Sequence, residues 1–281
     1  MASPEPAAPP PLEQLSLNQI TTKSWGLAQA IEGCVRHGIR GISVWRDKLV
    51  EMGLAKAAKA VRDAGLTVSG VCRGGMFTFA DAAERKAKIE DNLHAIDEAE
   101  ALGAQCLIMV VGGLPSGSKD IDGAREQVAE GLAAILPHAR AAKVPLAIEP
   151  LHPMQCADRA CVNTLDQALD LCDRLGAGTG VAVDVYHVWW DPNLARAIRR
   201  AGKERLLAYH VCDWLVPTTD LAFDRGMMGD GVIDLPAIRG LMQAAGYAGM
   251  HECEIFSARH WWQRDPDEVL AIIKERFRRC C

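Results

Sequence analysis

Pro145-Leu-Ala-Ile-Glu149 is a short apolar run that ends on a carboxylate, and the chain repeats this pattern three more times. The other runs are Gly180-Val-Ala-Val-Asp184, Leu206-Leu-Ala-Tyr-His210 and Met250-His-Glu-Cys-Glu254. Short apolar runs of this length are typical of buried strands in a parallel sheet. The sequence therefore predicts four strands, each of which carries a carboxylate or an imidazole at its end.

Around these runs, strand-like segments alternate with longer helical patterns along the chain. The predicted strands are 15–20, 41–44, 67–71, 106–110, 146–148, 181–183, 208–211 and 252–255. The predicted helices are 27–36, 54–64, 83–102, 122–141, 163–175, 194–201, 236–245 and 266–277. Alternation of this kind indicates βα units and a parallel sheet. Eight units without a break in composition predict a single (β/α)8 TIM barrel of the α/β class.

The chain of 281 residues is long enough to form one α/β barrel with a full core. Its first residues, Met1-Ala-Ser-Pro-Glu-Pro, continue into further prolines and alanines. We expect residues 1–12 to form a disordered N-terminal tail and residues 13–281 to form one barrel domain.

The net charge of −5 provides no general attraction to phosphate backbones, so we expect no nucleic acid partner. No apolar stretch approaches the length of a bilayer span, and the first residues lack the pattern of a secretion signal, so we expect no membrane partner. The ten cysteines lie mostly inside apolar helix or strand patterns rather than in a spaced disulfide framework. We therefore predict reduced thiols and a cytoplasmic location.

Glu149, Asp184, His210 and Glu254 end the last four predicted strands. Active-site groups of TIM barrels lie where strands end, so neighbouring strands can direct these side chains to one point. Buried carboxylates are costly there unless they are paired or coordinate a cation. Three carboxylates and one imidazole suit a hard or borderline ion, and we predict one divalent metal ion, Mn²⁺, Mg²⁺, Co²⁺ or Zn²⁺. The alternative is that each residue is separately paired with an arginine or satisfied within the core.

Several motifs follow the predicted strand ends in order. They are Ile148-Glu-Pro-Leu-His-Pro153, Asp184-Val-Tyr-His187, His210-Val-Cys-Asp-Trp214, Gly229-Asp-Gly231 and Glu252-Cys-Glu-Ile-Phe256. With these motifs the chain resembles the xylose isomerase-like TIM-barrel superfamily, in particular its sugar phosphate isomerase/epimerase branch. The resemblance covers nearly the whole chain.

The resemblance implies that the four strand-end residues hold one divalent ion and that Glu149 and Glu254 also act as an acid/base pair. It implies that His187, three residues after Asp184, contacts substrate hydroxyls. Glu252 and Glu254 alternate onto the same face of their strand, and we prefer Glu254 as the ligand because it lies nearer the mouth.

The substrate-contacting glutamate and arginine that usually follow the first and third ligands in this family are not recognisable. His152, Asp158, Arg159 and Asp213 occupy those neighbourhoods instead. The substrate-binding residues that we predict are His187, Arg73, His152, Arg159, Asp213, Trp25 and Trp214.

Two kinds of side chain near strand ends support this choice. Arg73 precedes two glycines that allow close approach of a ligand, and it could hold a carboxylate, a phosphate or an oxyanion, as could Lys23, Arg46 and Arg159. Each of these cations could instead pair with a local carboxylate. All seven tryptophans follow strand ends, where flat faces suit a sugar ring or an aromatic aglycone.

The resemblance implies a small-molecule carbohydrate substrate. A metal-bound sugar carbonyl allows the adjacent carbon to be deprotonated to an enediolate. Two carboxylates on opposite faces of that intermediate would epimerise it, and a single base would isomerise it. The alternative is a lyase that cleaves a keto-glycoside through the same enediolate.

Other readings remain open. An endonuclease IV-type phosphodiesterase would need more histidine ligands and a basic groove, and a non-catalytic barrel would bind no metal. The absence of a P-loop or Rossmann glycine pattern speaks against a nucleotide cofactor. Trp261 and Trp262 could either contact sugar or form the interface of a homo-oligomer.

Overall fold

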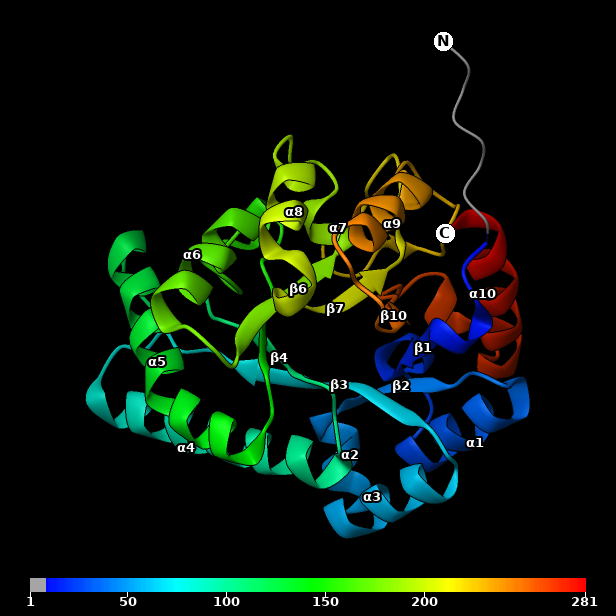
Figure 1. The fold of residues 1–281 in the computed structure, drawn as a ribbon, viewed down its shortest axis with the longest axis horizontal. Coiled ribbons are helices and arrows are strands. Elements are labelled where there is room, and N and C mark those ends of the chain that lie inside the picture. Colours follow the sequence, from blue (N-terminus) through cyan, green and yellow to red (C-terminus); the bar gives the residue numbers. More distant parts are fainter. Residues whose placement is uncertain (1–8) are drawn as a thin grey trace.

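The computed structural model describes residues 9–281, and Figure 1 shows how their helices and strands are arranged. Residues 1–8, which make up most of the predicted tail, lie outside the described residues. Eight strands pair in parallel and close into a barrel in the order β1-β10-β7-β6-β5-β4-β3-β2. The predicted TIM barrel is therefore confirmed.

The barrel strands are short, and β5 has the bounds that the sequence predicts. They are β1 (Leu15–Asn18), β2 (Gly41–Trp45), β3 (Thr67–Gly75), β4 (Leu107–Val110), β5 (Leu146–Ile148), β6 (Thr179–Asp184), β7 (Leu206–Val211) and β10 (His251–Cys253). All eight lie within one or a few residues of the expected positions. β3 extends four residues further than expected, to Gly75.

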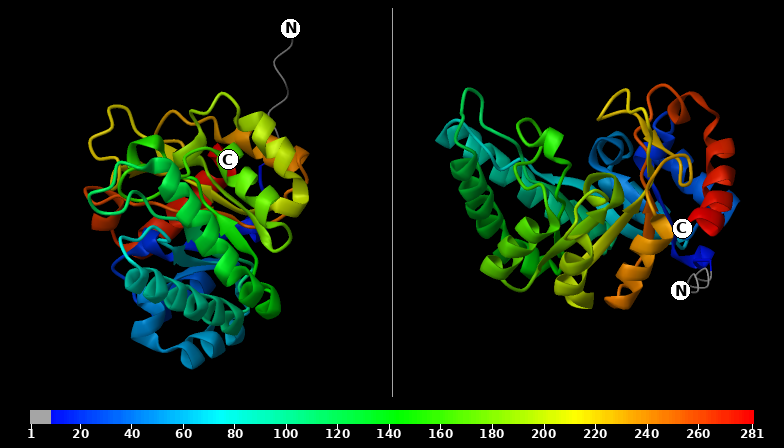
Figure 2. Two further views of the ribbon diagram at one scale, coloured as in Figure 1. Left: turned by 90° about the vertical axis from the view of Figure 1, so that its left-hand side faces the viewer. Right: turned by 90° about the horizontal axis from the view of Figure 1, so that it is seen from above.

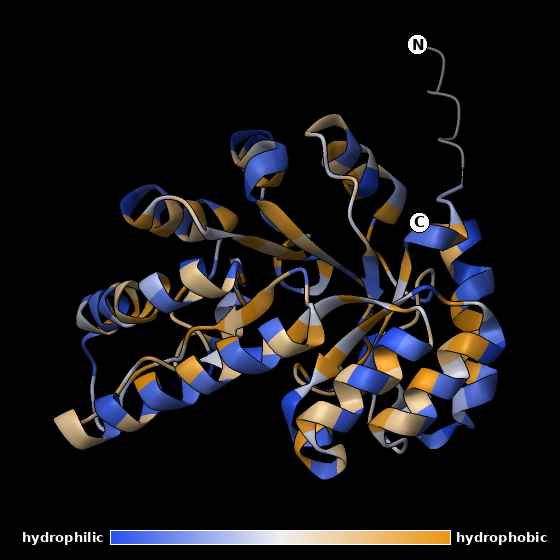
Figure 3. Cartoon of the chain, turned by 60° about the horizontal axis from the view of Figure 1, so that its bottom comes forward, coloured by the Kyte–Doolittle hydropathy of each residue, from blue (hydrophilic) through white to orange (hydrophobic). Residues whose placement is uncertain are grey.

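Helices surround the strands, as the two further views in Figure 2 show. The outer helices are α1 (Leu27–His37), α3 (Leu54–Asp63), α4 (Ala82–Leu102), α5 (Ile121–Ala142), α6 (Leu165–Leu175), α8 (Leu194–Arg205), α9 (Leu235–Ala244) and α10 (Pro266–Cys280). Figure 3 shows apolar residues along the strands and mixed polar and apolar residues around each helix. The main core therefore lies between the strands and the helix ring.

Local sequence determines where these helices begin. Thr164 caps α6, because its Oγ1 accepts a hydrogen bond from the Gln167 backbone N–H at 3.2 Å while the Gln167 side chain accepts one from the Thr164 N–H at 3.2 Å. Asp265 caps α10 by accepting from the Asp267 N–H at 2.9 Å, and Pro266 occupies the first helical position.

Additional short elements, which the sequence did not reveal, occur mainly after strand ends. They are α2 (Arg46–Met52), α7 (Val185–Val188), β8 (Asp213–Trp214) and β9 (Arg225–Gly226), together with four 3-10 helices (Leu12–Gln14, Gln19–Thr22, Pro153–Gln155 and Trp261–Gln263). β8 and β9 pair in antiparallel fashion after β7. Apart from Leu12–Gln14, which precedes β1, these elements follow the carboxyl ends of the barrel strands, where the mouth of the barrel lies.

Small side chains fill part of the barrel interior. A separate apolar cluster consists of Cys72, Cys106, Ile108, Ala147, Ala182 and Ala208, and all six are buried.

All ten cysteines are free thiols. The cytoplasmic location stays a prediction. Among the described residues, no helix is both long and apolar enough to cross a membrane.

Candidate metal centre

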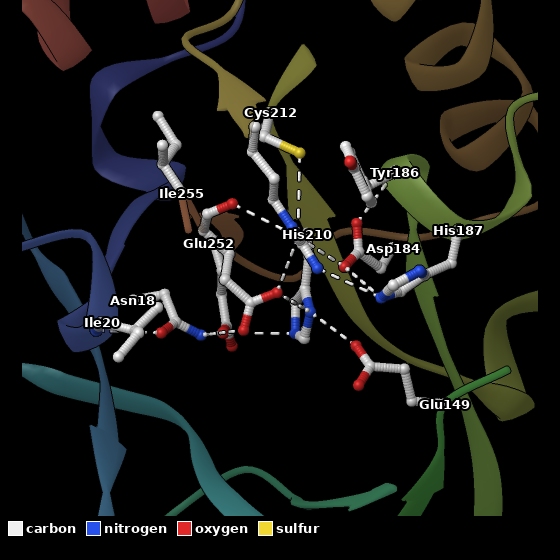
Figure 4. A network of polar contacts seen from close by, with 12 residues as sticks. Asn18, Ile20, Glu149, Asp184, Tyr186, His187, His210, Cys212, Glu252 and Ile255 are labelled. Atoms are coloured by element: carbon white, nitrogen blue, oxygen red, sulfur yellow. Dashed lines mark hydrogen bonds and ion pairs between the residues drawn. The ribbon is translucent and has the colours of Figure 1, made fainter. Parts of the chain in front are cut away.

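Four side chains converge at the carboxyl ends of adjacent strands. Asp184 is the last residue of β6, His210 lies in β7, and Glu149 and Glu254 directly follow β5 and β10. One ligand atom from each lies within 4.8 Å of the others, and all four residues are buried. Figure 4 shows Glu149, Asp184 and His210 directed toward a common point. The barrel closure therefore brings together the four predicted ligands.

Unpartnered polar atoms at this point indicate that the cluster fits a cation. Nδ1 of His210 lies 2.9 Å from Oε1 of Glu149 and 3.5 Å from Oε2 of Glu254. Nevertheless Oε1 of Glu149 and both ring nitrogens of His210 are buried without a partner in hydrogen-bonding geometry. Buried polar atoms of this kind need an explanation, and a divalent ion held by oxygen and imidazole donors provides one. The residues present therefore fit one divalent metal ion.

Burial and charge act against each other on these groups. Burial raises the pKa of Glu149 to about 7, and the adjacent His210 ring offsets only part of this effect. Burial is the largest single effect on Asp184 and disfavours its ionised form, but Arg225, His187, His210 and the Tyr186 backbone N–H together outweigh it and hold the pKa of that carboxyl at about 2. For His210, burial would lower the pKa, but Glu252 and Glu254 outweigh it and keep the pKa well above its usual value. Positive charge placed among these carboxylates therefore stabilises their ionised forms.

Arg225 is a functional residue that the sequence reading missed. Its Nη1 lies 2.8 Å from Oδ2 of Asp184 and 3.1 Å from Oε2 of Glu254. The guanidinium carbon lies 4.5 Å from the Tyr186 ring centroid and 5.0 Å from that of Phe256, so two aromatic faces hold it in place. Arg225 comes from β9, a two-residue strand inside a loop, and no periodic pattern marks that position.

His187 links the cluster to a neighbouring loop. Its Nδ1 accepts a hydrogen bond from the His152 backbone N–H at 3.1 Å. Its Nε2 lies 3.5 Å from Oδ2 of Asp184 and 3.1 Å from Nη2 of Arg225. Burial lowers the pKa of His187 to about 3, and Asp184 only partly opposes this effect. The ring is therefore neutral, and both of its nitrogens face protein groups.

Glu252 lies on the other side of the His210 ring from the cluster. Its Oε2 is 3.3 Å from Nε2 of His210, and it accepts a hydrogen bond from Nδ2 of Asn18 at 3.3 Å. Asn18 also donates to Oε1 of Glu254 at 3.0 Å and accepts from Nε1 of Trp45 at 2.7 Å. Metal-binding histidines commonly face a carboxylate with their second nitrogen, and this geometry directs Nδ1 of His210 to the cluster.

A cavity of about 260 Å³ opens over the cluster. Glu149, Glu254 and Arg225 lie in its wall, as do three predicted substrate-binding residues, His187, Arg73 and Arg159. Other lining residues are Trp45, Cys72, Met76, Gln155, Asp158, Leu221, Ala222 and Phe256. The cavity thus combines acid/base groups, cations and apolar surface, as a site for a polar small molecule requires.

Two of the predicted substrate-binding residues lie behind the cavity wall. Nδ1 of His152 accepts from the Met154 N–H at 3.2 Å, and its ring packs against Trp214 with centroids 5.0 Å apart. Trp214 packs in turn against Tyr186 at 4.6 Å. Neither His152 nor Trp214 lines the cavity. They support the residues that do.

Asp213 and Trp25 also lie outside the cavity. The buried Asp213 carboxylate accepts from the backbone N–H groups of Trp214, Gly229 and Ile233 at 2.9, 2.9 and 3.0 Å. These bonds fasten both ends of the loop that carries Arg225. Trp25 packs over Gly33 of α1, and its ring lies 5.7 Å from the Arg36 guanidinium carbon.

The fold is a TIM barrel with a strand-end cluster of residues that could hold a metal ion. The family model described as xylose isomerase-like TIM barrel matches residues 31–278. The chain therefore belongs to the xylose isomerase-like TIM-barrel family, which confirms the resemblance drawn from the strand-end motifs. No curated protein sequence matches the chain.

Solved structures agree with this assignment. Protein SMc04130 from Sinorhizobium meliloti 1021 is 59% identical, with a TM-score of 0.95 over 96% of this chain and 99% of that one. The 3-keto-D-glucoside 4-epimerase YcjR from E. coli is 18% identical, with a TM-score of 0.76 over 95% and 99% of the two chains. D-psicose 3-epimerase is 19% identical, with a TM-score of 0.75 over 95% and 96%. At these lower identities the likeness concerns the fold alone.

Proposed function

We propose that the protein is a divalent-metal-dependent epimerase or isomerase that acts on a keto sugar or a derivative of one. The observation that carries the proposal is that four buried donor residues converge below a cavity. Two of them, Glu149 and Glu254, also line that cavity, where a bound ligand can contact them. The similarity in fold to D-psicose 3-epimerase and to a 3-keto-D-glucoside 4-epimerase supports the same class of reaction.

Glu149, Asp184, His210 and Glu254 would hold the ion. When bound, a divalent ion supplies Lewis-acid stabilisation for the charge that develops on substrate oxygens during deprotonation. The protein's own groups do the rest. Glu149 exchanges a proton with the substrate carbon, because its carboxylate lies in the cavity wall where a bound substrate can reach it.

Glu254 is placed as the second acid/base group. It accepts hydrogen bonds from Asn18 at 3.0 Å and Arg225 at 3.1 Å, which fix its position in the cavity wall. Proton removal by one glutamate and return by the other inverts a stereocentre, whereas one glutamate serving two carbons exchanges aldose and ketose. The His187 ring lies in the cavity wall beside Arg225, where it can contact a substrate hydroxyl.

A lyase acting on a keto-glycoside is the second candidate. A second cavity of about 550 Å³ meets the first at Trp45, Cys72, Arg73 and Met76. It has room for a leaving group next to the reacting sugar. Loss of a group β to the deprotonated carbon would use the same glutamates.

The two candidates are separated by incubating Mn²⁺-loaded protein in D₂O with D-fructose and, separately, with a 3-keto-glucoside that carries a chromogenic aglycone. Deuterium at a carbon next to the carbonyl without aglycone release supports the epimerase or isomerase. Aglycone release supports the lyase. E149Q and E254Q should each abolish the reaction, while E32Q, at an exposed position in α1, should not.

Absence of both exchange and release in protein that demonstrably holds one ion per chain would overturn the proposal and favour a non-catalytic barrel.

A further inference from the structure

Two arginines enter the cavity without an acidic partner. We propose that the substrate carries an anionic group, a carboxylate or a phosphate, and that Arg73 and Arg159 bind it. The inference rests on the proposed function only in taking the substrate to be a sugar derivative held over the metal cluster. Arg73 lies near the end of β3, and Arg159 lies in the segment after β5.

A β-bulge places Arg73 in the cavity. In a regular strand, Cys72 and Arg73 would point to opposite faces of the sheet. The register between β3 and β4 shifts between Cys72 and Gly74, so Arg73 is an extra residue without a partner on β4. As a result both Cys72 and Arg73 line the cavity. Bulges beside functional sites commonly redirect a side chain in this way.

The backbone of Arg159 is fixed by the loop that follows β4. The Gly112 N–H donates to the Arg159 carbonyl at 3.0 Å, and Gly112 forms a parallel bridge with Ala160. A Cβ at Gly113 would lie 2.4 Å from the Ala157 carbonyl oxygen, so the two loops are in close contact. The Arg159 guanidinium carbon lies 6.0 Å from the centroid of the Phe223 ring. The side chain is thus presented from a fixed base.

Among the described residues, the cations at the mouth differ in their partners: Arg46 is held by acidic groups, whereas Lys23 and Arg159 lie only against aromatic rings. Arg46 pairs with Glu98 at 2.6 Å and Asp91 at 2.9 Å, and Lys23 lies 4.1 Å from the Trp262 ring centroid. Within residues 9–281, neither Arg73 nor Arg159 forms an ion pair or a side-chain hydrogen bond, although Asp158 lines the same cavity.

Although Arg73 is an exposed residue, partial loss of water around its guanidinium and the charge of the nearby Arg159 both lower the pKa of Arg73. Two guanidinium groups that repel each other beside a cavity are stabilised when an anion binds between them. Guanidinium forks match the geometry of carboxylate and phosphate oxygens, which explains the choice of arginine. The anionic group would therefore anchor the substrate and position its carbonyl carbon over Glu149 and Glu254.

The test uses three polyols that cannot react because they lack a keto or aldehyde group: D-glucitol, D-glucitol 6-phosphate and D-gluconate. Binding of each to Mn²⁺-loaded wild-type protein, R73Q, R159Q and R40Q is measured by calorimetry. Arg40 lies just before β2, at the opposite end of the barrel, and serves as the matched control. We expect one anionic polyol to bind at least about tenfold more tightly than D-glucitol to the wild type and to R40Q.

In R73Q and R159Q the ratio of anionic-polyol affinity to D-glucitol affinity should fall below about threefold, while the affinity for D-glucitol itself stays unchanged. Preference for the phosphate ester identifies a sugar phosphate, and preference for D-gluconate identifies a sugar acid. Equal binding of all three polyols, or a preference that survives in both arginine variants, would overturn the inference. These outcomes are independent of turnover, so the anion site can fail while the D₂O experiment succeeds, and the reverse.

Discussion

Nη1 of Arg225 lies 2.8 Å from Oδ2 of Asp184 in an ion pair that is almost fully excluded from solvent. The same nitrogen lies 3.1 Å from Oε2 of Glu254, so one guanidinium contacts two of the four proposed metal ligands. A metal ion and Arg225 would therefore share the negative charge of Asp184 and Glu254.

Replacement of Arg225 should change the response to metal. R225M leaves Asp184 and Glu254 without their cationic partner, and breaking a buried ion pair costs about 3–5 kcal/mol. We expect the metal-free variant to melt at lower temperature than wild type, and added Mn²⁺ to raise its melting temperature by more than it raises that of wild type. R225K, which keeps the charge, should lie between them. An equal increment in wild type and R225M would contradict the shared role.

The metal content of two ligand variants tests the centre itself. D184N and H210A each remove one donor from the cluster, so we expect the ion retained per chain after Mn²⁺ loading and desalting to fall more than tenfold, about the effect of a lost metal contact. Elemental analysis measures it. D122N, whose side chain is 89% exposed at the start of α5, is the control. Full retention of metal by D184N would remove the basis of the proposed function.

Glu252 should act on metal through His210. Its Oε2 lies 3.3 Å from Nε2 of His210, so E252Q weakens the group that fixes the ring orientation without removing a proposed ligand. We expect Mn²⁺ affinity, measured by competition with a chelator, to fall about 10- to 100-fold. In wild type the ¹⁵N chemical shifts of the His210 ring should correspond to one protonation state. In E252Q they should correspond to a mixture of states. Wild-type affinity together with unchanged ring shifts would mean that Glu252 serves packing alone.

Close contact between two mouth loops predicts a large effect for a small substitution. The added methyl of G113A would lie 2.4 Å from the Ala157 carbonyl oxygen, a backbone atom that cannot move aside cheaply. We expect the free energy of unfolding to fall by about 1–3 kcal/mol. G240A in α9, where nothing lies within 4 Å, should instead raise it by about 0.5–1 kcal/mol. Similar values for the two variants would show that the loops are not tightly packed.

His251 should make stability depend on pH. Burial is the main reason that the pKa of His251 falls from 6.5 to about 4 in the folded protein. Above pH 6.5 both folded and unfolded chains carry the neutral ring. As the pH falls from 6.5 toward 4, only the unfolded chain takes up the proton, so the free energy of unfolding decreases by up to about 3 kcal/mol.

Urea unfolding at pH 7.5 and pH 5 measures this decrease. The difference between the two pH values should be smaller by about 2 kcal/mol in H251F than in wild type. H94Q, at an exposed histidine of α4, should keep the wild-type difference. Equal pH dependence in wild type and H251F would show that His251 is not the titrating group.

Local patterns were sufficient to predict the barrel. The strand 146–148 and the start of the last helix at Pro266 follow from apolar runs and capping residues that lie within a few positions of each other. The four cluster residues were found for the same reason, because strand ends in a closed parallel barrel meet at one mouth.

Features that depend on pairing between distant segments were not predictable. Arg225 reaches the cluster because β9 pairs with β8 and Asp213 fastens the surrounding loop. Arg73 was predicted to lie at the site from the two glycines that follow it, but the bulge that directs it into the cavity was not predictable. Glu252 and Glu254 share a face of their strand and differ in their depth in the barrel. Because of this difference, Glu252 contacts Nε2 of His210 whereas Glu254 contacts Nδ1.

The three backbone hydrogen bonds to Asp213 have a consequence for how such a barrel can diversify. They clamp the base of the segment between β8 and β9, whereas Leu221 and Ala222 near its tip form part of the cavity wall. We therefore expect that substitutions near the tip would change the shape of the cavity while Arg225 and the cluster keep their positions. A library confined to residues 215–223 would vary ligand choice on an unchanged chemical centre.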